Sequence, residues 1–241
     1  MKISVVIPAF NEEKLLPATL ASVRAASAAF EARGWATELV VCDNNSTDRT
    51  AEIARAGGAT VVFEPVNQIA RARNTGAART SGDWLVFVDA DSQPSQALFE
   101  EVAETIADGR CIAGGCTVRL DMRRFAVRFF VSLWNAISRI RGWAAGSFMF
   151  CEAAAFRQIG GFSQEIYAAE DIELFRRLKR LARERGRTIV ILHRHPLATS
   201  DRKARLYTVR EHLALLMKIG TSRGRVLHDR DACFPWYDGR R

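Results

Sequence analysis

The stretch Trp84-Leu85-Val86-Phe87-Val88-Asp89-Ala90-Asp91-Ser92-Gln93-Pro94 decides the fold class of this chain. Its first five residues are apolar without alternation, which predicts a strand buried on both faces, as in a parallel sheet covered by helices. Two acidic residues follow at once. In open sheets of this kind, ligands bind beyond the carboxyl ends of the strands. The stretch therefore predicts an α/β fold with its chemistry at one sheet edge.

Upstream, three further apolar, β-branched runs predict strands at residues 3–7, 38–42 and 59–63. A helical pattern lies between the first two, because Leu16, Leu20, Val23 and Phe30 recur at helical spacings. A second helix ends at Gly57-Gly58 and has Ser46 or Thr47 as its candidate cap. This βα repetition predicts an open, doubly wound, Rossmann-like domain with a mostly parallel central sheet flanked by helices.

The second half is less regular. We predict helices near residues 95–107, 171–185 and 206–219, strands near 112–118, 147–151 and 188–192, and a basic aromatic stretch at 122–141. No internal repeat or low-complexity linker divides the chain, and α/β folds of this length often form one unit. We therefore expect a single domain over residues 1–241.

The composition, with 48% hydrophobic and 26% charged residues, is that of a folded globular protein. A formal net charge of +8 favours anionic partners, which include nucleotide phosphates, acidic membrane surfaces and nucleic acid. The five cysteines form no C-x-x-C pair, so they are interpreted as small buried hydrophobes rather than zinc ligands or disulfides. The N-terminus has no signal-peptide pattern, and arginines interrupt the most apolar stretch, so a cytoplasmic protein without a membrane span is expected.

Asp89 and Asp91, two residues apart on extended backbone, point the same way and can hold one hard divalent cation. Gln93 offers a third oxygen. Such a cation, Mn²⁺ or Mg²⁺, would clamp a diphosphate leaving group. The structural alternative is an Asp-rich turn before a helix that Ser95 caps.

Asp43 follows the second strand, where it can bind a base or ribose or form an Asx-turn, and Asn11 has a similar ambiguity as an N-cap. Arg71 and Arg73 begin a later helix and diverge by about 200°, so at most one of them faces the site; Arg71 is preferred.

Glu170 and Asp171 open a helix and point about 100° apart, so they need separate roles rather than sharing one proton. One can act as a general base on an acceptor hydroxyl while the other orients the acceptor. Acidic residues are also favoured at helix N-termini for structural reasons alone.

Three features of the second half have weaker signals. His195 is a candidate metal or phosphate contact, and Arg202 a candidate phosphate contact, although both also fit a solvated basic loop. The amphipathic stretch 125–134 suits either an anionic membrane surface, an acceptor groove or packing on the core.

In chain order these features resemble family 2 glycosyltransferases, which have the GT-A fold. The resemblance covers roughly residues 3–180 and is carried by Val5-Val6-Ile7-Pro8-Ala9-Phe10-Asn11-Glu12-Glu13, Cys42-Asp43-Asn44-Asn45-Ser46-Thr47-Asp48, Asp89-Ala90-Asp91, and Gly160-Gly161-Phe162 followed by Glu170-Asp171-Ile172-Glu173-Leu174. The run from Asp89 to Pro94 is also similar to that of dolichyl-phosphate mannose synthases, whose glutamine at the Gln93 position is a metal ligand.

The resemblance implies an inverting glycosyltransferase with Asp171 as the base and Glu170 placing the acceptor. Residues 1–118 would bind a UDP- or GDP-sugar, 119–200 the acceptor, and 201–241 would form a helical tail. It implies metal ligands at Asp91, Asp89 and Gln93. The expected nucleotide-sugar contacts are Pro8, Ala9, Asn11, Glu12, Asp43, Asn45, Arg71, Asp89 and Ala90.

The expected partners are a nucleotide sugar, an acceptor such as a lipid or polyprenyl phosphate, the inner face of a membrane and a second copy of the chain, but not nucleic acid. Two departures from the family pattern matter: Asn44-Asn45 replaces the usual Asp-Gly, and no Gln-x-x-Arg-Trp motif follows the catalytic helix, which argues against a processive synthase. The alternatives are a nucleotidyltransferase, although the first loop has no glycine, and a non-catalytic binding module.

Overall fold

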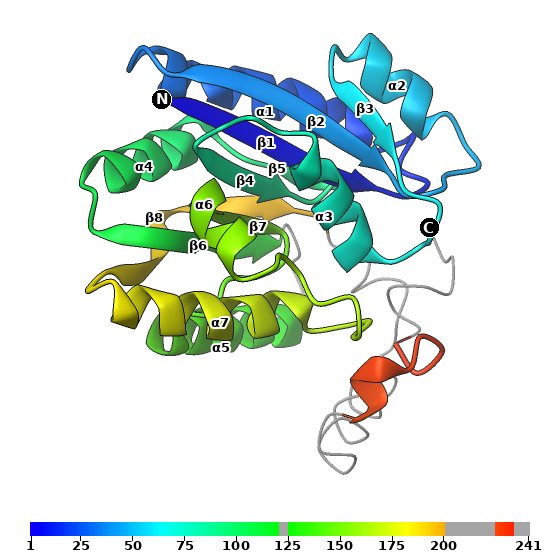
Figure 1. The fold of residues 1–241 in the computed structure, drawn as a ribbon. Coiled ribbons are helices and arrows are strands. Elements are labelled where there is room, and N and C mark those ends of the chain that lie inside the picture. The colour runs from blue at the N-terminus through cyan, green and yellow to red at the C-terminus, as the bar shows by residue number, and fades with distance from the viewer. Residues whose placement is uncertain (121–124, 201–224, 234–241) are drawn as a thin grey trace.

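The computed structural model describes residues 1–120, 125–200 and 225–233, with the backbone alone for residues 120 and 125–130. Figure 1 shows one twisted sheet with helices packed against it. The strands are β1 (Lys2–Ala9), β2 (Ala36–Asp43), β3 (Thr60–Phe63), β4 (Trp84–Val88), β5 (Ser92–Gln93), β6 (Cys111–Leu120), β7 (Phe148–Glu152) and β8 (Thr188–Thr199). The helices are α1 (Leu16–Glu31), α2 (Thr50–Ala56), α3 (Ile69–Ala78), α4 (Gln96–Ala107), α5 (Phe125–Arg141), α6 (Ala153–Gln158) and α7 (Glu170–Glu184), with a short 3₁₀ helix η1 (Arg225–His228).

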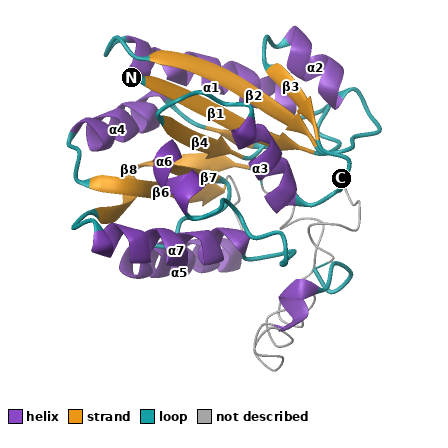
Figure 2. Ribbon diagram, in the orientation of Figure 1, coloured by secondary structure: helices purple, strands orange, loops and turns teal. Residues whose placement is uncertain are grey.

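The strand order across the sheet is β3-β2-β1-β4-β7-β6-β8-β5. The pairs β1–β2, β1–β4, β2–β3 and β6–β8 are parallel, whereas β7 runs antiparallel to both neighbours and β5 is antiparallel to β8. The mostly parallel sheet flanked by helices is therefore confirmed (Figure 2).

Two apolar clusters cover the two faces of the sheet. Along β1, Ile3, Val5 and Ile7 belong to the cluster that contains α1 and α4, while Val6 belongs to the cluster that contains α3, α6 and α7. Because successive side chains of a strand point to opposite faces, both faces need apolar residues. This explains the unbroken apolar runs of the sequence.

Two local predictions were wrong. Helix α2 begins at Thr50, not near Ser46 or Thr47, because the carboxylate of Asp48 accepts the Thr50 N–H at 2.9 Å and starts the helix there. Strand β8 continues to Thr199 because β6 and β5 both pair with its second half, and an irregular stretch between Leu192 and Leu197 absorbs the polar residues. The Ser95 cap of α4 is confirmed, since its hydroxyl accepts the Leu98 N–H.

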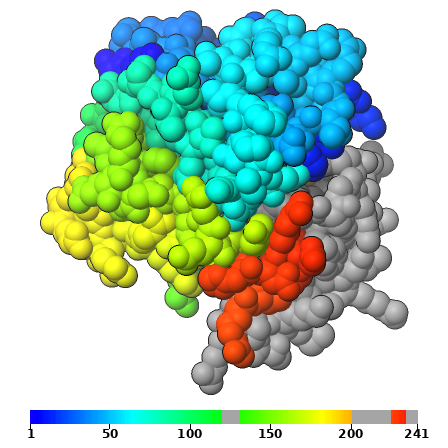
Figure 3. Space-filling view, turned by 45° about the vertical axis from the view of Figure 1, so that its right-hand side comes forward, coloured from blue at the N-terminus to red at the C-terminus, as the bar shows by residue number. Residues whose placement is uncertain are grey.

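The described part of the second half includes α5, which covers most of the basic aromatic stretch, and η1. The space-filling view shows residues 225–233 in red against the yellow-green loop that precedes α7 (Figure 3), where the Tyr167 N–H donates to the Leu227 carbonyl at 2.7 Å. The predicted helix at 206–219 lies outside the described residues. Among the described helices, none has the length and hydrophobicity that crossing a membrane requires.

Candidate active site

The carboxyl ends of β1, β2 and β3 lie side by side, because the parallel register aligns Ala9 with Asp43 and Asp43 with Phe63. Beyond them, the Asn44 N–H donates to the Ala9 carbonyl at 2.7 Å. β4 pairs in parallel with β1 on its other side, so Asp89 and Ala90 follow at the same edge (Figure 1). The sequence predicted that the loops after β1, β2 and β4 lie together, and the sheet register confirms this prediction.

The loops after β1 and β2 are tied together by Asn11. Its side-chain oxygen accepts the Thr47 N–H at 2.8 Å, and its own N–H donates to the Ser46 hydroxyl at 3.0 Å. The next residue, Glu12, donates its N–H to the Thr50 hydroxyl at 2.8 Å. Asn11 therefore joins two loops rather than capping α1, whose N-cap position is Leu15.

Asp43 forms the Asx-turn that the sequence offered as one alternative. Its Oδ1 accepts the Ser46 N–H at 3.0 Å, and its side chain is largely buried. Asn45, at the tip of this turn, has φ +65°, in the left-handed region that Asn tolerates better than other non-glycine residues. This conformation explains how Asn45 can stand where the family pattern has glycine.

At the same edge, Arg73 of α3 joins three parts of the chain. Its side chain is 1% exposed, donates to Glu170 Oε1 at 2.7 Å and Asp89 Oδ1 at 2.9 Å, and also donates to the Gly146 carbonyl at 2.8 Å. The guanidinium lies 5.2 Å from the centre of the Phe162 ring. Burial alone would lower the Arg73 pKa, but the charges of Asp89, Glu170 and Asp171 raise it, so Arg73 stays charged.

Arg73 joins this cluster, whereas Arg71, the arginine preferred from the sequence, lies outside it. Arg71 points to the loop before α7, where it donates to Gln164 Oε1 at 2.8 Å. The buried residues of α3 are Ala70, Ala72, Arg73, Gly76 and Ala77, and Arg73 lies three residues after Ala70 and four before Ala77. The small residues on either side of Arg73 were the signal in the sequence, since they mark the helix face that packs against the protein.

Asp171 lies beside this cluster in the first turn of α7 and is half-buried. The Gly146 N–H donates to its carboxylate, and a Cβ added to Gly146 would come within 3.1 Å of Asp171 Oδ2. Burial and the nearby charge of Glu170 raise the Asp171 pKa from 3.8 to about 7, although Arg73 opposes the rise. A carboxylate with such a pKa can accept a proton near neutral pH.

We expect Asp171→Asn to stabilise the chain at pH 8 but not at pH 4. The folded-state pKa of Asp171 lies above its ordinary value of 3.8, so its stabilising contribution is complete below about pH 4 and is lost as pH rises through about 7. Removing the charge should raise the free energy of unfolding at pH 8 by roughly 1–3 kcal/mol. A fully buried carboxylate would give a larger gain, but the Asp171 side chain keeps some solvent contact. Urea unfolding at both pH values measures this, and lower stability of the variant at pH 8 would contradict it.

Asp91 immediately precedes β5, and Gln93 lies on the opposite side of β5 from Ser92, whose buried hydroxyl donates to the Thr199 hydroxyl. Asp91 Oδ2 accepts the Ser200 hydroxyl at 2.7 Å, and its carbonyl accepts the Ser200 N–H at 3.1 Å. Ser200 was not predicted as a site residue because β8 was expected to end at residue 192.

The residues at this edge fit a divalent cation that shares its ligands with a substrate. One guanidinium faces three carboxylates, which leaves the cluster with excess negative charge. In the described part of the chain no three His, Cys, Asp or Glu side chains form a complete metal site. Mg²⁺ commonly uses one or two protein carboxylates with substrate phosphates, and Asp89 and Asp91 would be the candidates for such a pair.

His195 lies away from this group. It is exposed in the irregular part of β8, where its neighbour Arg194 contacts Glu101 and Glu104 of α4. Nothing in the described geometry brings His195 to Asp91. Arg202 lies outside the described residues.

A mostly parallel sheet with carboxylate-bearing loops at the ends of its strands is the architecture of GT-A-type proteins. The mannosyltransferase PcManGT from Pyrobaculum calidifontis, solved with GDP-Man and Mn²⁺, has this fold at a TM-score of 0.67 and 20% identity, over 96% of this chain and 64% of that one. Residues 4–159 match the family model Glycosyl transferase family 2. The chain belongs to that family.

Two relatives are similar in sequence. The undecaprenyl-phosphate 4-deoxy-4-formamido-L-arabinose transferase of Pseudomonas paraeruginosa is 33% identical over 65% of this chain and 47% of its own length. An uncharacterized glycosyltransferase of Mycobacterium tuberculosis is 38% identical over 37% of this chain and 36% of its own length. The chain therefore spans about a third to a half of the length of these relatives.

Proposed function

We propose that this chain is a non-processive glycosyltransferase that moves a sugar from a nucleoside-diphosphate sugar to an acceptor hydroxyl or phosphate, with inversion at the anomeric carbon. For a hydroxyl acceptor, its proton passes to the Asp171 carboxylate as its oxygen bonds to the anomeric carbon. The bond between that carbon and the diphosphate oxygen breaks, and the nucleoside diphosphate leaves with the electron pair.

The observation that carries the proposal is the position of Asp171. It lies against Gly146 beside the Arg73–Asp89 pair, on the edge where β1, β2 and β4 end, and burial beside Glu170 raises its pKa to about 7. A base whose pKa is close to the working pH combines a deprotonated population with enough basicity to take a proton. Glu170, whose Oε1 accepts a hydrogen bond from buried Arg73 at 2.7 Å, serves to hold the cluster in place.

The donor half of the site would comprise residues 1–118, with Pro8, Ala9, Glu12 and Asp43 toward the nucleotide. Asp89 and Asp91, with Gln93 as a further oxygen, would hold Mn²⁺ or Mg²⁺, which supplies charge neutralisation for the departing diphosphate. Residues 119–200 would place the acceptor and residues 201–241 would form the tail. The Mn²⁺ and GDP-Man named with PcManGT support this assignment of donor and metal.

A lipid phosphate is the acceptor class that we propose to test first. The support is the name of the Pseudomonas relative, which transfers a sugar to undecaprenyl phosphate. The protein would then act in the cytoplasm at the inner face of the membrane.

The test is a panel of UDP- and GDP-sugars with Mn²⁺ or Mg²⁺, offered with sugar, small hydroxyl and polyprenyl-phosphate acceptors. We expect metal-dependent release of nucleoside diphosphate together with a glycosylated acceptor of inverted configuration. Release of pyrophosphate from a nucleoside triphosphate and a sugar phosphate would instead identify a nucleotidyltransferase. Binding of nucleotide without turnover on any acceptor would identify a binding module.

We expect Asp91→Asn to raise the Mn²⁺ concentration needed for half-maximal activity by at least about tenfold, because the carboxylate charge attracts the cation. The matched control is Asp83→Asn. Asp83 lies just before β4, at the end of the strand opposite to the site, where its carboxylate accepts the Lys2 N–H at 2.8 Å. Titration of activity against Mn²⁺ compares the two. Equal metal requirements in both variants would remove Asp91 from the metal site.

A further inference from the structure

A stripe of positive charge runs along the outer side of α7. It consists of Arg176, Lys179, Arg180 and Arg183, which lie one helical turn apart or less. The three arginines are exposed and Lys179 is half-buried. In the part of the chain that the structure describes, none of the four pairs with a carboxylate, whereas Arg177, on another side of the helix, pairs with Glu173.

The stripe continues onto the end of α5 through Trp143. The guanidinium groups of Arg141 and Arg176 lie 5.7 Å and 5.6 Å from the centre of the Trp143 ring. Burial, followed by the charges of Arg183 and Arg141, lowers the pKa of Lys179. Like charges held this close repel one another, so the cluster costs the isolated chain stability and would gain from an anionic partner.

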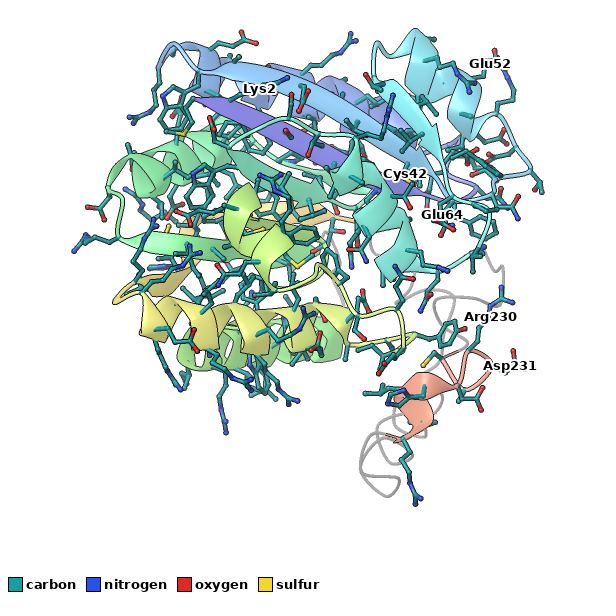
Figure 4. All side chains as sticks on the ribbon, viewed as in Figure 1. Lys2, Cys42, Glu52, Glu64, Arg230 and Asp231 are labelled. Carbon is teal, nitrogen blue, oxygen red and sulfur yellow. The ribbon has the colours of Figure 1, made fainter. Side chains whose placement is uncertain are left out.

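Helix α5 also exposes apolar side chains. On α5, Leu133, Ile137 and Ile140 are 46%, 37% and 83% exposed, and their spacing of four and three residues places them on one face. The opposite side of α5 faces the sheet, where Asn135 forms two hydrogen bonds with the backbone of Val118. Beneath α5 and α7, long side chains that end in nitrogen point away from the sheet (Figure 4).

Unpaired cations next to exposed apolar side chains match one kind of partner closely. An anionic bilayer offers phosphate and carboxylate headgroups for the cations and acyl chains for the apolar groups. A second copy of the chain, packed symmetrically on this surface, would bring two basic stripes together. An acidic protein would pair with the cations but would leave the exposure of Ile140 unexplained.

We propose that this basic–apolar surface, formed by Leu133, Ile137, Ile140 and Arg141 of α5 and by Arg176, Lys179, Arg180 and Arg183 of α7, docks on an anionic membrane. The proposal does not depend on the reaction. It goes beyond the proposed function by giving the chain an orientation: α7 lies along the bilayer and its first turn carries Glu170 and Asp171.

The test is co-sedimentation of the full chain with vesicles of phosphatidylcholine alone or with 30% phosphatidylglycerol, about one anionic lipid in three. We expect binding only to the anionic vesicles and a weakening at high salt. Each cation near such a surface contributes about fivefold in partitioning, so the triple variant Arg176→Gln, Arg180→Gln, Arg183→Gln should bind about 100-fold more weakly. The control variant Arg33→Gln, Arg55→Gln, Arg79→Gln removes the same charge from exposed positions associated with α1, α2 and α3 and should bind nearly as the parent does.

A second pair of variants tests the apolar component. Ile137→Ser with Ile140→Ser should also reduce vesicle binding, whereas thermal melting should change little, because Ile140 is 83% exposed and Ile137 is partly exposed. Equal losses in the two arginine variants, or equal binding to neutral and anionic vesicles, would overturn the proposal. Self-association that Ile137→Ser with Ile140→Ser abolishes, without vesicle binding by the parent, would assign the surface to a second copy instead.

Discussion

Replacing Asp171 with Asn is expected to lower the rate of sugar transfer to a hydroxyl acceptor by about 10²–10⁴-fold, the range typical for loss of a general base. Asn has nearly the same shape as Asp but cannot accept the proton of the acceptor hydroxyl. In the parent enzyme, burial and Glu170 raise the pKa of Asp171 to about 7, so kcat/KM should fall below about pH 7 as this carboxylate becomes protonated. The acid limb of the pH profile should disappear in the variant.

Donor binding should be little changed in the same variant. The contacts of Arg73 with Asp89 and Glu170 do not involve Asp171, so the edge of the sheet that faces the donor keeps its arrangement. Calorimetric titration with the nucleotide sugar should therefore give a Kd within about twofold of the parent value, which corresponds to less than about 0.5 kcal/mol.

The matched control is Glu173→Gln, which removes a carboxylate from the same helical turn but from an ion pair with Arg177. It should keep most of the transfer activity. Transfer to a hydroxyl acceptor that persists at the parent rate in Asp171→Asn would exclude Asp171 as the base. Full activity on a phosphate acceptor alone would have a different meaning, because an ionised phosphate has no proton to lose.

The sequence predicted the donor edge well for a local reason. Asp43, Asp89 and Asp91 come directly after apolar runs, and parallel strands place such residues together whatever packs around them. The left-handed conformations of Asn11 and Asn45 concern the same short loops. The roles of these loop residues in nucleotide binding stay predictions, whereas the placement of the loops after β1, β2 and β4 at one edge of the sheet is confirmed.

The other half of the site depends on contacts between distant segments. Ala70 and Ala77 mark the buried side of α3 on which Arg73 lies, but only the packing of that side against Gly146, Glu170 and Phe162 shows what Arg73 contacts. Similarly, Ser200 reaches Asp91 because β8 pairs with both β6 and β5 beyond residue 192. Helix periodicity shows that a face exists but not which segment will cover it.

Arg73 is therefore the residue whose loss should most affect the fold. Arg73→Met, which keeps much of the side-chain volume, is expected to lower the free energy of unfolding by about 3–5 kcal/mol, because Glu170 is left buried and both Asp89 and Glu170 lose the hydrogen bond from Arg73. Urea unfolding at pH 7.5 measures the loss. Arg71→Met, two residues away, should cost less than about 1 kcal/mol, since among the described residues that guanidinium has an exposed hydrogen bond to the Gln164 side chain.

A double variant separates the charge effect from packing. Adding Glu170→Gln to Arg73→Met removes the buried carboxylate charge that has lost its ion pair with Arg73, so the double variant should be more stable than Arg73→Met alone. A double variant less stable than the single one would show that packing of the guanidinium, rather than its charge, holds the edge together.

The same variant also tests whether Arg73 sets the basicity of Asp171. The Arg73 charge lowers the Asp171 pKa, against burial and Glu170, which raise it. Without Arg73, the pKa of Asp171 should rise further, and the acid limb of kcat/KM should move to higher pH than in the parent. Arg73→Lys keeps the charge but cannot reach Asp89 and Glu170 with separate nitrogens of a rigid fork, so it should preserve the limb better than it preserves stability. If the acid limb of kcat/KM in Arg73→Met lies at the same pH as in the parent enzyme, Arg73 has a structural role only.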